Sequence, residues 1–417
     1  MLNTVILLSP FERCSNQELL KHMTYLNPNV PFDVGFYQPL KQVFSRVILY
    51  DYIKRMVEVG VKGVNREIID LVKKERPQYA LWVALGSYYE IQETTFNAIR
   101  AAGTKVIGWF FDDNTRFDTY SKWWAPYIDY FVTNDLAAVT KYQELGTWAT
   151  QAICTGYPCD RPKDEKYGVS FVGTKFADRE QYIKTLNRNG IHVDLFGAGF
   201  GKFVPYAEMM NIFSVSKVNL NFAKSDENGI KNPTIKARIF EVCLAGGFLL
   251  TEYFPGIEDY FEIDREIACF RNPEEMIDKI AYYLNHDEQR RAIAQAGWKR
   301  ATNEYTSFHM MSRVFREIEE AKGRESKPKQ LGMPKKILAR VSNFYCDWGI
   351  AFSMVNHRSL SRDALLLSAS YYPFNARAWY HYIISFLPHS LRLHVISFCR
   401  RALKIIGRDD LISQSCK

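Results

Sequence analysis

Short apolar runs rich in β-branched and aromatic residues alternate with amphipathic segments over the first 321 residues. Apolar runs of this kind, separated by helical patterns, are typical of parallel α/β units. In the first half, the pattern predicts helices near residues 63–74, 92–102 and 135–145. The predicted strands have the sequences TVILL, YALWVAL, KVIGWFF and YFVTN, which begin at residues 4, 79, 105 and 130.

The alternation stops near residue 156 and then restarts. The stretch TGYPCDRPKDEKYG combines proline, glycine and charged residues, which is typical of an interdomain linker. Beyond it, VSFVGT, HVDLFG, KVNLNF, GFLLTE and EIACF predict five further strands, and three helical patterns close the body. The sequence therefore predicts an N-terminal domain over 1–155, a linker over 156–168, a second domain over 169–321 and a tail over 322–417.

Small and polar residues follow the predicted strands of the second domain. Ligands of doubly wound α/β sheets bind at the carboxyl ends of the strands, so two such domains are expected to face one another across a cleft. Glycines at these positions let backbone N–H groups approach a phosphate, although a glycine-rich run alone also fits a simple turn. The strand-end residues singled out on this ground are Gly173, Thr174, Gly199, Asn221 and Glu252.

The segment KNPTIKARIFEVCLAGGFLLTE, residues 231–252, gathers cations where a helix is predicted to begin. Asn232 suits an N-cap and Pro233 suits the first helical position. Lys236 and Arg238 then lie near the positive end of the helix dipole, where each cation is disfavoured by roughly 0.3–1 kcal/mol. A bound anion reverses that sign, because a helix N-terminus is a phosphate site. The alternative is a solvated basic face.

In that alternative, Arg238 and Glu241 form an ion pair one helical turn apart. The same helix is expected to end at Gly246 or Gly247, since glycine readily adopts the left-handed conformation of a helix terminus. An apolar strand follows at once.

Two adjacent carboxylates end a strand of the first domain, at Asp112 and Asp113. Burial and mutual repulsion raise the pKa of at least one member of such a pair, which suits a general base near neutral pH. The alternatives are an N-cap for the next helix or a hydrogen-bonded turn. No third acid or histidine is placed to complete a metal site, so no metal is predicted.

Charge and cysteine content narrow the class of protein. Residues 1–320 carry 38 Lys+Arg and 41 Asp+Glu, whereas residues 321–417 carry 16 and 5, so the net charge of +8 comes from the tail. No apolar run approaches the length of a transmembrane helix, and the N-terminus lacks the basic region of a secretory signal. The 8 cysteines form neither CxxC nor a zinc pattern, which predicts reduced cysteines in the cytoplasm.

The second half resembles the bacterial group 1 glycosyltransferase domain of the CgeB (spore maturation) type. The resemblance rests on VSFVGTKFADREQYI, VDLFGAGFG, SKVNLNFAKS and IKARIFEVCLAGGFLLTE with the helical run that follows, and in the first half on GTKVIGWFFDDNTRFDTY and YIDYFVTND. It covers roughly residues 75–320. It implies a GT-B fold, in which two Rossmann-like domains face a cleft, with a nucleotide-sugar donor in the second domain and no required metal.

The resemblance also implies roles for individual residues. Lys236 and Arg238 would contact the donor diphosphate, and Glu241 would accept hydrogen bonds from the ribose hydroxyls. Gly246 and Gly247 would allow close approach of the backbone. Gly173 and Thr174 would border the sugar or the phosphate, while the E-x7-E spacing of many retaining relatives is absent at Glu241, because position 233 is proline.

The tail over 322–417 is similar to the helical tails of some bacterial glycosyltransferases. Within residues 388–408, apolar positions form one helical face and arginines and lysines the remainder, which is the pattern of a basic amphipathic helix. An anionic membrane or a partner protein fits that pattern. The alternative is a helix docked on its own domain with its basic face in solvent.

The sequence thus predicts a glycosyltransferase that uses a nucleotide-diphosphate sugar as co-substrate and no further cofactor. The acceptor is expected to be a glycan, a lipid-linked glycan or a protein, and no nucleic-acid-binding signature is present. The expected location is cytoplasmic, with peripheral contact to the inner face of the membrane as a variant. Two alternatives stay open: a non-catalytic nucleotide-sugar-binding scaffold and a GT-B-like sugar-nucleotide epimerase.

Overall fold

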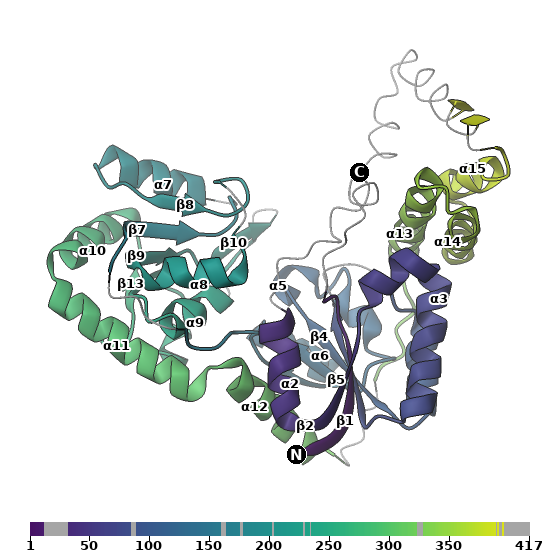
Figure 1. The fold of residues 1–417 in the computed structure, drawn as a ribbon, viewed down its shortest axis with the longest axis horizontal. Coiled ribbons are helices and arrows are strands. Elements are labelled where there is room, and N and C mark those ends of the chain that lie inside the picture. The colour runs from purple at the N-terminus through teal and green to yellow at the C-terminus, as the bar shows by residue number, and fades with distance from the viewer. Residues whose placement is uncertain are drawn as a thin grey trace.

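The chain forms two α/β domains and a C-terminal group of helices, seen here in a computed structural model (Figure 1). The structure describes residues 1–11, 32–84, 89–159, 164–175, 178–201, 204–227, 230–233, 235–322, 328–388, 390–391 and 394–395, without the side chains of 224–227 and 230–233.

The first domain is built on a six-stranded parallel sheet with the order β2-β1-β3-β4-β5-β6. Parallel strands covered on both faces are near-continuous apolar runs, which is why the sequence pattern located most of them. The register places Val5 of β1 between Val47 of β2 and Tyr79 of β3. The strands are β1 (Leu2–Leu8), β2 (Phe44–Tyr50), β3 (Tyr79–Ala84), β4 (Lys105–Phe110), β5 (Tyr130–Thr133) and β6 (Trp148–Gln151).

Helices cover both faces of this sheet, and successive strand residues enter different layers because side chains alternate across a strand. Val5 and Leu7 belong to a buried cluster with α2 (Gln38–Val43) and α12 (Ser307–Glu320). Ile6 and Leu8 belong to the opposite cluster with α3 (Tyr52–Glu75) and α4 (Glu93–Ala101). The domain is completed by η2 (Asp33–Tyr37), α5 (Asp113–Arg116), η3 (Ser121–Trp124) and α6 (Leu136–Glu144).

The second domain has a five-stranded parallel sheet with the order β13-β12-β9-β7-β8. Its strands are β7 (Tyr167–Val172), β8 (Asp194–Phe196), β9 (Ser216–Asn221), β12 (Leu249–Glu252) and β13 (Ala268–Phe270). Its helices are α7 (Arg179–Arg188), α8 (Tyr206–Ser214), α9 (Ala237–Leu244), α10 (Pro273–Asn285) and α11 (Asp287–Glu304), with a short η4 (Ile257–Asp259).

The cation-rich helix starts later than the sequence pattern predicts. Residues Ile230–Pro233 form strand β11, which pairs with β10 (Lys224–Glu227) in an antiparallel ribbon. Asn232 and Pro233 therefore belong to a strand, and Lys236 occupies the N-cap position of α9. The side chain of Lys231, the first cation of this segment, lies outside the described residues. The expected end of the helix is confirmed, since Gly246 has φ of +73°.

The chain crosses between the domains twice. It leaves the first domain after β6 and returns through α11 to α12, which packs beside α2 against the first sheet (Figure 1). The two crossings are bonded to each other, because Thr155 Oγ1 donates to Tyr305 O at 2.7 Å and Ser307 N donates to Gly156 O at 2.8 Å.

The described part of the tail joins the first domain. It consists of α13 (Lys335–Met354), α14 (Arg358–Tyr371) and α15 (Ala376–Ile384), and apolar residues of α13 and α14 enter the same buried cluster as α3 and α4. Tyr345 Oη donates to Tyr89 O at 2.7 Å, and Tyr371 Oη donates to Glu93 Oε2 at 2.6 Å. None of the described helices combines the length and the apolar character needed to cross a bilayer.

Glu90 is a carboxylic acid buried beneath these helices. Its side chain is 0% exposed, and among the described residues neither Oε1 nor Oε2 has a hydrogen-bond partner. Burial raises its pKa to about 8, from 4.5 in an exposed site. The folded state therefore holds an extra proton between these two pH values, and folding stability falls as pH rises through that window.

We predict that Glu90→Gln removes this part of the pH dependence, because a neutral amide has no proton to lose. In the wild type, the free energy of unfolding should fall by roughly 3–5 kcal/mol between the two pKa values, and in the variant this fall should be absent. Urea unfolding from pH 5 to pH 8 measures the slope, and Glu144→Gln, exposed on α6, is the control. Parallel pH profiles for wild type and Glu90→Gln would contradict the assignment.

Candidate functional site

The order of strands marks one point on the edge of the second sheet. From β7 the chain goes to β8 on one side and then crosses to β9 on the other, so the order reverses between β7 and β9. Ligands of open α/β sheets bind outside the carboxyl ends of the strands at such a switch point. Gly173 follows β7 directly and Asn221 ends β9. The beginning of α9 lies beside both.

Arg238 of α9 occupies this switch point. One of its guanidinium nitrogens donates to Asn221 Oδ1 at 3.0 Å, and its guanidinium carbon lies 5.3 Å from the ring centre of Phe171. A Cβ at Gly173 would lie 2.9 Å from Arg238 Nη2, so glycine is required there for this approach. Asn221 is itself oriented by donating to Thr251 Oγ1 at 2.9 Å. Asn221 thus positions Arg238 and is buried away from solvent.

A second arginine, which the sequence reasoning did not identify, reaches the same place. Arg179 at the start of α7 lies 5.7 Å from the ring centre of Phe171 and donates to Thr174 O at 2.9 Å. Its position in a polar stretch before a helix carries no periodic signal. The sequence feature that could have identified Arg179 is its position shortly after a strand that is followed by glycine and threonine.

Lys236 adds a third cation at the N-cap of α9. Burial lowers its pKa, Arg179 and Arg238 lower it further, and Asp112 from the first domain opposes them. Burial followed by repulsion from Arg179 lowers the pKa of Arg238 to about 10. The three cations therefore lie close enough to repel one another, at the positive end of a helix dipole.

The two guanidinium groups are left partly unsatisfied. The Nε atoms of Arg179 and Arg238 are buried and have no hydrogen-bond partner, and neither arginine forms an ion pair within the part of the chain that the structure describes. Buried donors without acceptors are rare in folded proteins, and buried charges are normally paired. An anion with several oxygens, such as a diphosphate, satisfies both requirements here.

Two carboxylates border the cation cluster of Arg179, Lys236 and Arg238. Glu252 ends β12 and is held by Tyr182 Oη at 3.3 Å and by the N–H of Ala223 at 3.2 Å. Glu241 lies one turn after Arg238 on α9, and no hydrogen bond to its carboxylate is found among the described residues. Burial raises the pKa of Glu241 to about 7, against the opposing charge of Arg238. The sequence alternative of a solvated Arg238–Glu241 pair does not describe this buried arrangement.

The remaining glycines of the predicted donor site divide into two groups. Gly199 follows β8 at the switch-point edge, has φ of +82°, and would place a Cβ 2.8 Å from Lys175 Cβ. Gly246 and Gly247 lie at the other end of α9 from Lys236. A Cβ at Gly247 would meet Phe213 O at 2.5 Å, so this glycine serves helix–strand packing. The geometry thus separates Gly246 and Gly247 from the donor site.

The first domain presents Asp112 and not Asp113 to the facing edge. Asp112 follows β4 with φ of +58°, its side chain is 51% exposed, and its charge acts on Lys236. Its N–H donates to Asn134 Oδ1 at 3.0 Å. Asp113 is 0% exposed and accepts a hydrogen bond from Tyr142 Oη at 2.9 Å. Burial raises the pKa of Asp113 to about 6.

A small pocket connects the two carboxyl edges beside these residues. From the first domain it is lined by Asn134, Asp135, Leu136 and Gln151, and from the second by Ile235 and Phe254–Gly256 with Asp259 and Tyr260. Tyr260 Oη donates to Gln151 Oε1 at 2.8 Å across the domain boundary. The pocket has a volume of about 100 Å³. The segments that follow β1 and β3 on the same edge, residues 12–31 and 85–88, lie outside the described residues.

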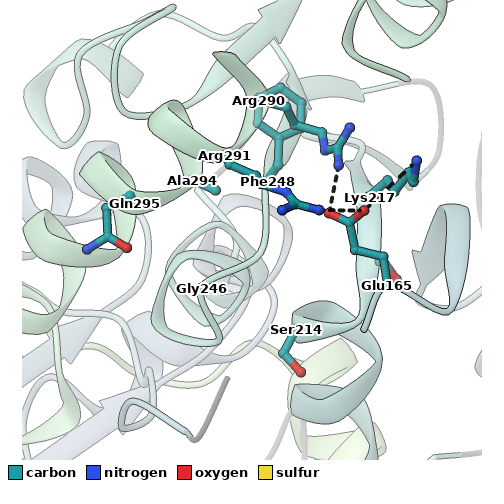
Figure 2. Close-up of a pocket in the computed structure, with 10 residues that line it drawn as sticks. Glu165, Ser214, Lys217, Gly246, Phe248, Arg290, Arg291, Ala294 and Gln295 are labelled. Atoms are coloured by element: carbon teal, nitrogen blue, oxygen red, sulfur yellow. Dashed lines mark hydrogen bonds and ion pairs between the residues drawn. The ribbon is translucent and has the colours of Figure 1, made fainter. Parts of the chain in front are cut away.

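A larger cavity of about 370 Å³ lies at the amino ends of β7, β9 and β12, beside α11, and has different chemistry (Figure 2). It contains Arg290, Arg291 and Lys217, but Glu165 lies among them and pairs with Arg290 at 2.6 Å and Arg291 at 3.4 Å. Gly246, at the end of α9, is part of its wall. Its cations are compensated, in contrast to Arg179 and Arg238, which form no ion pair among the described residues.

Comparisons with known proteins agree with this architecture. A family model described as "Glycosyl transferase-like" matches residues 179–316, which contain Arg179, Lys236, Arg238, Glu241 and Glu252. No curated protein matches the chain significantly. The CgeB subtype is not identified by the family match.

Among solved structures, Anabaena Alr3699/HepE in complex with UDP aligns with a TM-score of 0.50 at 9% identity and covers 77% of this chain and 100% of its own. A glycosyltransferase from Rickettsia africae gives 0.46 at 10% identity, covering 78% and 100%, and TarM from S. aureus gives 0.44 at 10%, covering 61% and 58%. The likeness to the Anabaena structure shows the fold, which is GT-B with two Rossmann-like domains and added C-terminal helices.

We predict that inorganic pyrophosphate binds at the switch point. Arg179→Ala and Arg238→Ala should each weaken pyrophosphate binding by roughly 1–3 kcal/mol, the range for charge-assisted hydrogen bonds. Isothermal titration calorimetry measures the change. Arg188→Ala, which removes an exposed arginine from the last turn of the same helix α7, is the control. Equal affinity in all four proteins would show that the cluster is not an anion site.

Proposed function

We propose that this protein is a group 1 glycosyltransferase that needs no metal and moves a sugar from a nucleotide-diphosphate sugar to an acceptor hydroxyl. The family match over residues 179–316 and the GT-B fold support nucleotide-sugar-dependent glycosyl transfer. The observation that carries the finer proposal is the cluster of Arg179, Lys236 and Arg238 at the switch point, in which the buried Nε atoms of both arginines have no acceptor among the described residues.

The cations would hold the donor diphosphate and stabilise it as a leaving group. When the bond between the anomeric carbon and the diphosphate oxygen breaks, the electron pair stays on that oxygen and negative charge grows there. Guanidinium and ammonium groups fixed beside that oxygen stabilise the developing charge without reorganising. This is the role that a divalent cation has in metal-dependent enzymes. Three cations gathered at one point are the basis for proposing metal independence.

Glu241 is proposed to bind the ribose of the donor. Its carboxylate lies one turn from Arg238, and its charge is one cause of the raised pKa of Tyr206 and Cys154 after burial itself. Glu241 therefore faces the linker side of the site. A ribose there would donate its hydroxyl hydrogens to a carboxylate that lacks other hydrogen-bond donors among the described residues.

Asp112 is the better candidate of the two predicted bases. Its exposed carboxylate lies on the facing domain and acts electrostatically on Lys236, so the donor and the acceptor would meet between them. The acceptor oxygen would bond to the anomeric carbon while its proton passes to Asp112. Asp113 is buried under Tyr142 and would act only by supporting the turn that carries Asp112.

The acceptor is proposed to be a glycan, a lipid-linked glycan or a protein. The basic amphipathic pattern over residues 388–408 lies for the most part outside the described residues. Contact of that pattern with an anionic membrane or a partner protein stays a proposal.

Binding of a panel of nucleotides tests the donor site, with UDP first because the Anabaena neighbour holds UDP. Arg238→Ala should weaken the binding of both pyrophosphate and UDP. Glu241→Ala should weaken UDP by about 1–2 kcal/mol while leaving pyrophosphate unchanged or tighter, because a nearby negative charge is removed. If no nucleotide binds to folded protein, the proposal fails. An isomerised donor without any acceptor would identify an epimerase instead.

Asp112→Asn is predicted to lower the turnover number by roughly 10²–10⁴-fold, the usual contribution of a general base. Its affinity for UDP should stay the same or rise, since an anion beside Lys236 is neutralised. Radiolabelled sugar transfer measures turnover, and calorimetry measures UDP affinity. Asp113→Asn is the comparison. It should lower the thermal unfolding midpoint, and it should lower the turnover number less than Asp112→Asn does. A stable Asp113→Asn protein with no transfer would move the base to Asp113.

A further inference from the structure

Exposed large apolar side chains gather on one part of the tail. Among the described residues, nine large hydrophobic side chains are exposed, and six of them fall between residues 366 and 391. Single exposed apolar residues are ordinary, but a concentration of them marks an interaction surface. The six are Leu366, Phe374, Trp379, Ile383, Phe386 and Leu391.

Three of these residues form a continuous stripe, called here the α15 stripe. Trp379 and Ile383 lie on α15, four residues apart, and Phe386 follows three residues later in the turns that continue the helix. Spacings of four and three residues place side chains on one helical face. Ile383 is 66% exposed and Phe386 is 56% exposed. The opposite face of α15 buries Ala378, His381 and Ile384 against the protein.

The α15 stripe is held in place by polar contacts. Trp379 Nε1 donates to Pro373 O at 2.8 Å. Arg362 of α14 lies over the Phe386 ring at 3.9 Å, and its Nε donates to Ser385 Oγ at 3.1 Å. The apolar side chains are therefore presented in a fixed arrangement, so little conformational entropy is lost when they are covered.

Among the described residues, a cation without an ion pair touches the α15 stripe: Arg362, which lies over the Phe386 ring. In the sequence, residues 364–408 contain six arginines and lysines and no aspartate or glutamate, but five of the six, from Arg392 onward, lie outside the described residues. The two nearest preceding acids in the sequence are neutralised, since Asp347 pairs with Arg377 at 2.8 Å and Asp363 pairs with Lys62 at 2.9 Å. Apolar and aromatic side chains beside an unpaired cation such as Arg362 are the combination that binds the interface of an anionic bilayer.

We propose that the α15 stripe docks on an anionic lipid surface. The stripe lies at the outer end of α13 and α14, on the side of the molecule away from the second domain (Figure 1). These helices are fixed to residues that follow β3, through Tyr345 on Tyr89 and Tyr371 on Glu93. Docking there brings the carboxyl edge of the first sheet toward the bilayer. If the proposed function holds, this favours a lipid-linked acceptor.

Flotation of the full chain with vesicles tests the proposal. Vesicles of phosphatidylcholine with about 30% phosphatidylglycerol should bind the protein, and pure phosphatidylcholine should bind it far less. The double variant Ile383→Asn/Phe386→Asn keeps the net charge and should lower the partition coefficient at least about tenfold, because its apolar contact is lost. Tyr282→Asn, which removes an exposed aromatic residue of α10 in the second domain, is the control and should bind as wild type does.

UDP affinity and the thermal unfolding midpoint are measured on the same preparations and should be unchanged in the double variant. If the wild-type protein binds no anionic vesicles, the proposal is overturned. This includes the case in which gel filtration shows that the stripe joins two copies of the chain. Equal vesicle binding by the double variant and wild type also overturns it. Loss of UDP binding in all preparations, with vesicle binding intact, would reject the proposed function and leave the lipid surface standing.

Discussion

The repulsion among Arg179, Lys236 and Arg238 is the constraint on which the rest of the site depends. Three cations are held together only because their surroundings fix them: Gly173 leaves room, Phe171 offers its ring to both guanidinium groups, and Asn221 orients Arg238. Holding these three cations close together costs electrostatic free energy until an anion binds among them. Ligand that binds only the folded state stabilises it, so the second domain is expected to gain stability from its own donor.

The fold places this cluster where a second group can act on it. Both sheets are parallel, and both turn their carboxyl edges toward the interdomain pocket, so strand ends separated by more than one hundred residues meet. Asp112 acts on Lys236 across this boundary, while Tyr260 and Gln151 bond the domains beside it. In the proposed mechanism the chemistry is therefore divided between the domains, with the leaving group on one and the base on the other.

Much of this could be predicted from the sequence, because buried parallel strands are apolar runs that a pattern detects. The beginning of α9 could not, since Asn232 and Pro233 look like a helix start but pair in a ribbon with β10. Arg179 was missed because a polar helix start has no periodicity. Asp112 and Asp113 are equivalent in sequence, and only backbone geometry makes one exposed and the other buried. Gly246 and Gly247 share a motif with Lys236 but lie a helix length away from it.

The bonded pair of domain crossings near Thr155 and Tyr305 has a mechanical consequence. Two connections that lie side by side and share hydrogen bonds act as a single pivot, which permits rotation of one domain about the other but resists sliding and twisting. A small angular change at the pivot is converted by the length of each domain into a larger displacement at the facing edges. The separation of Asp112 from Lys236 therefore depends on the angle at this joint, and opening it would also break the Tyr260–Gln151 hydrogen bond that closes the facing edges.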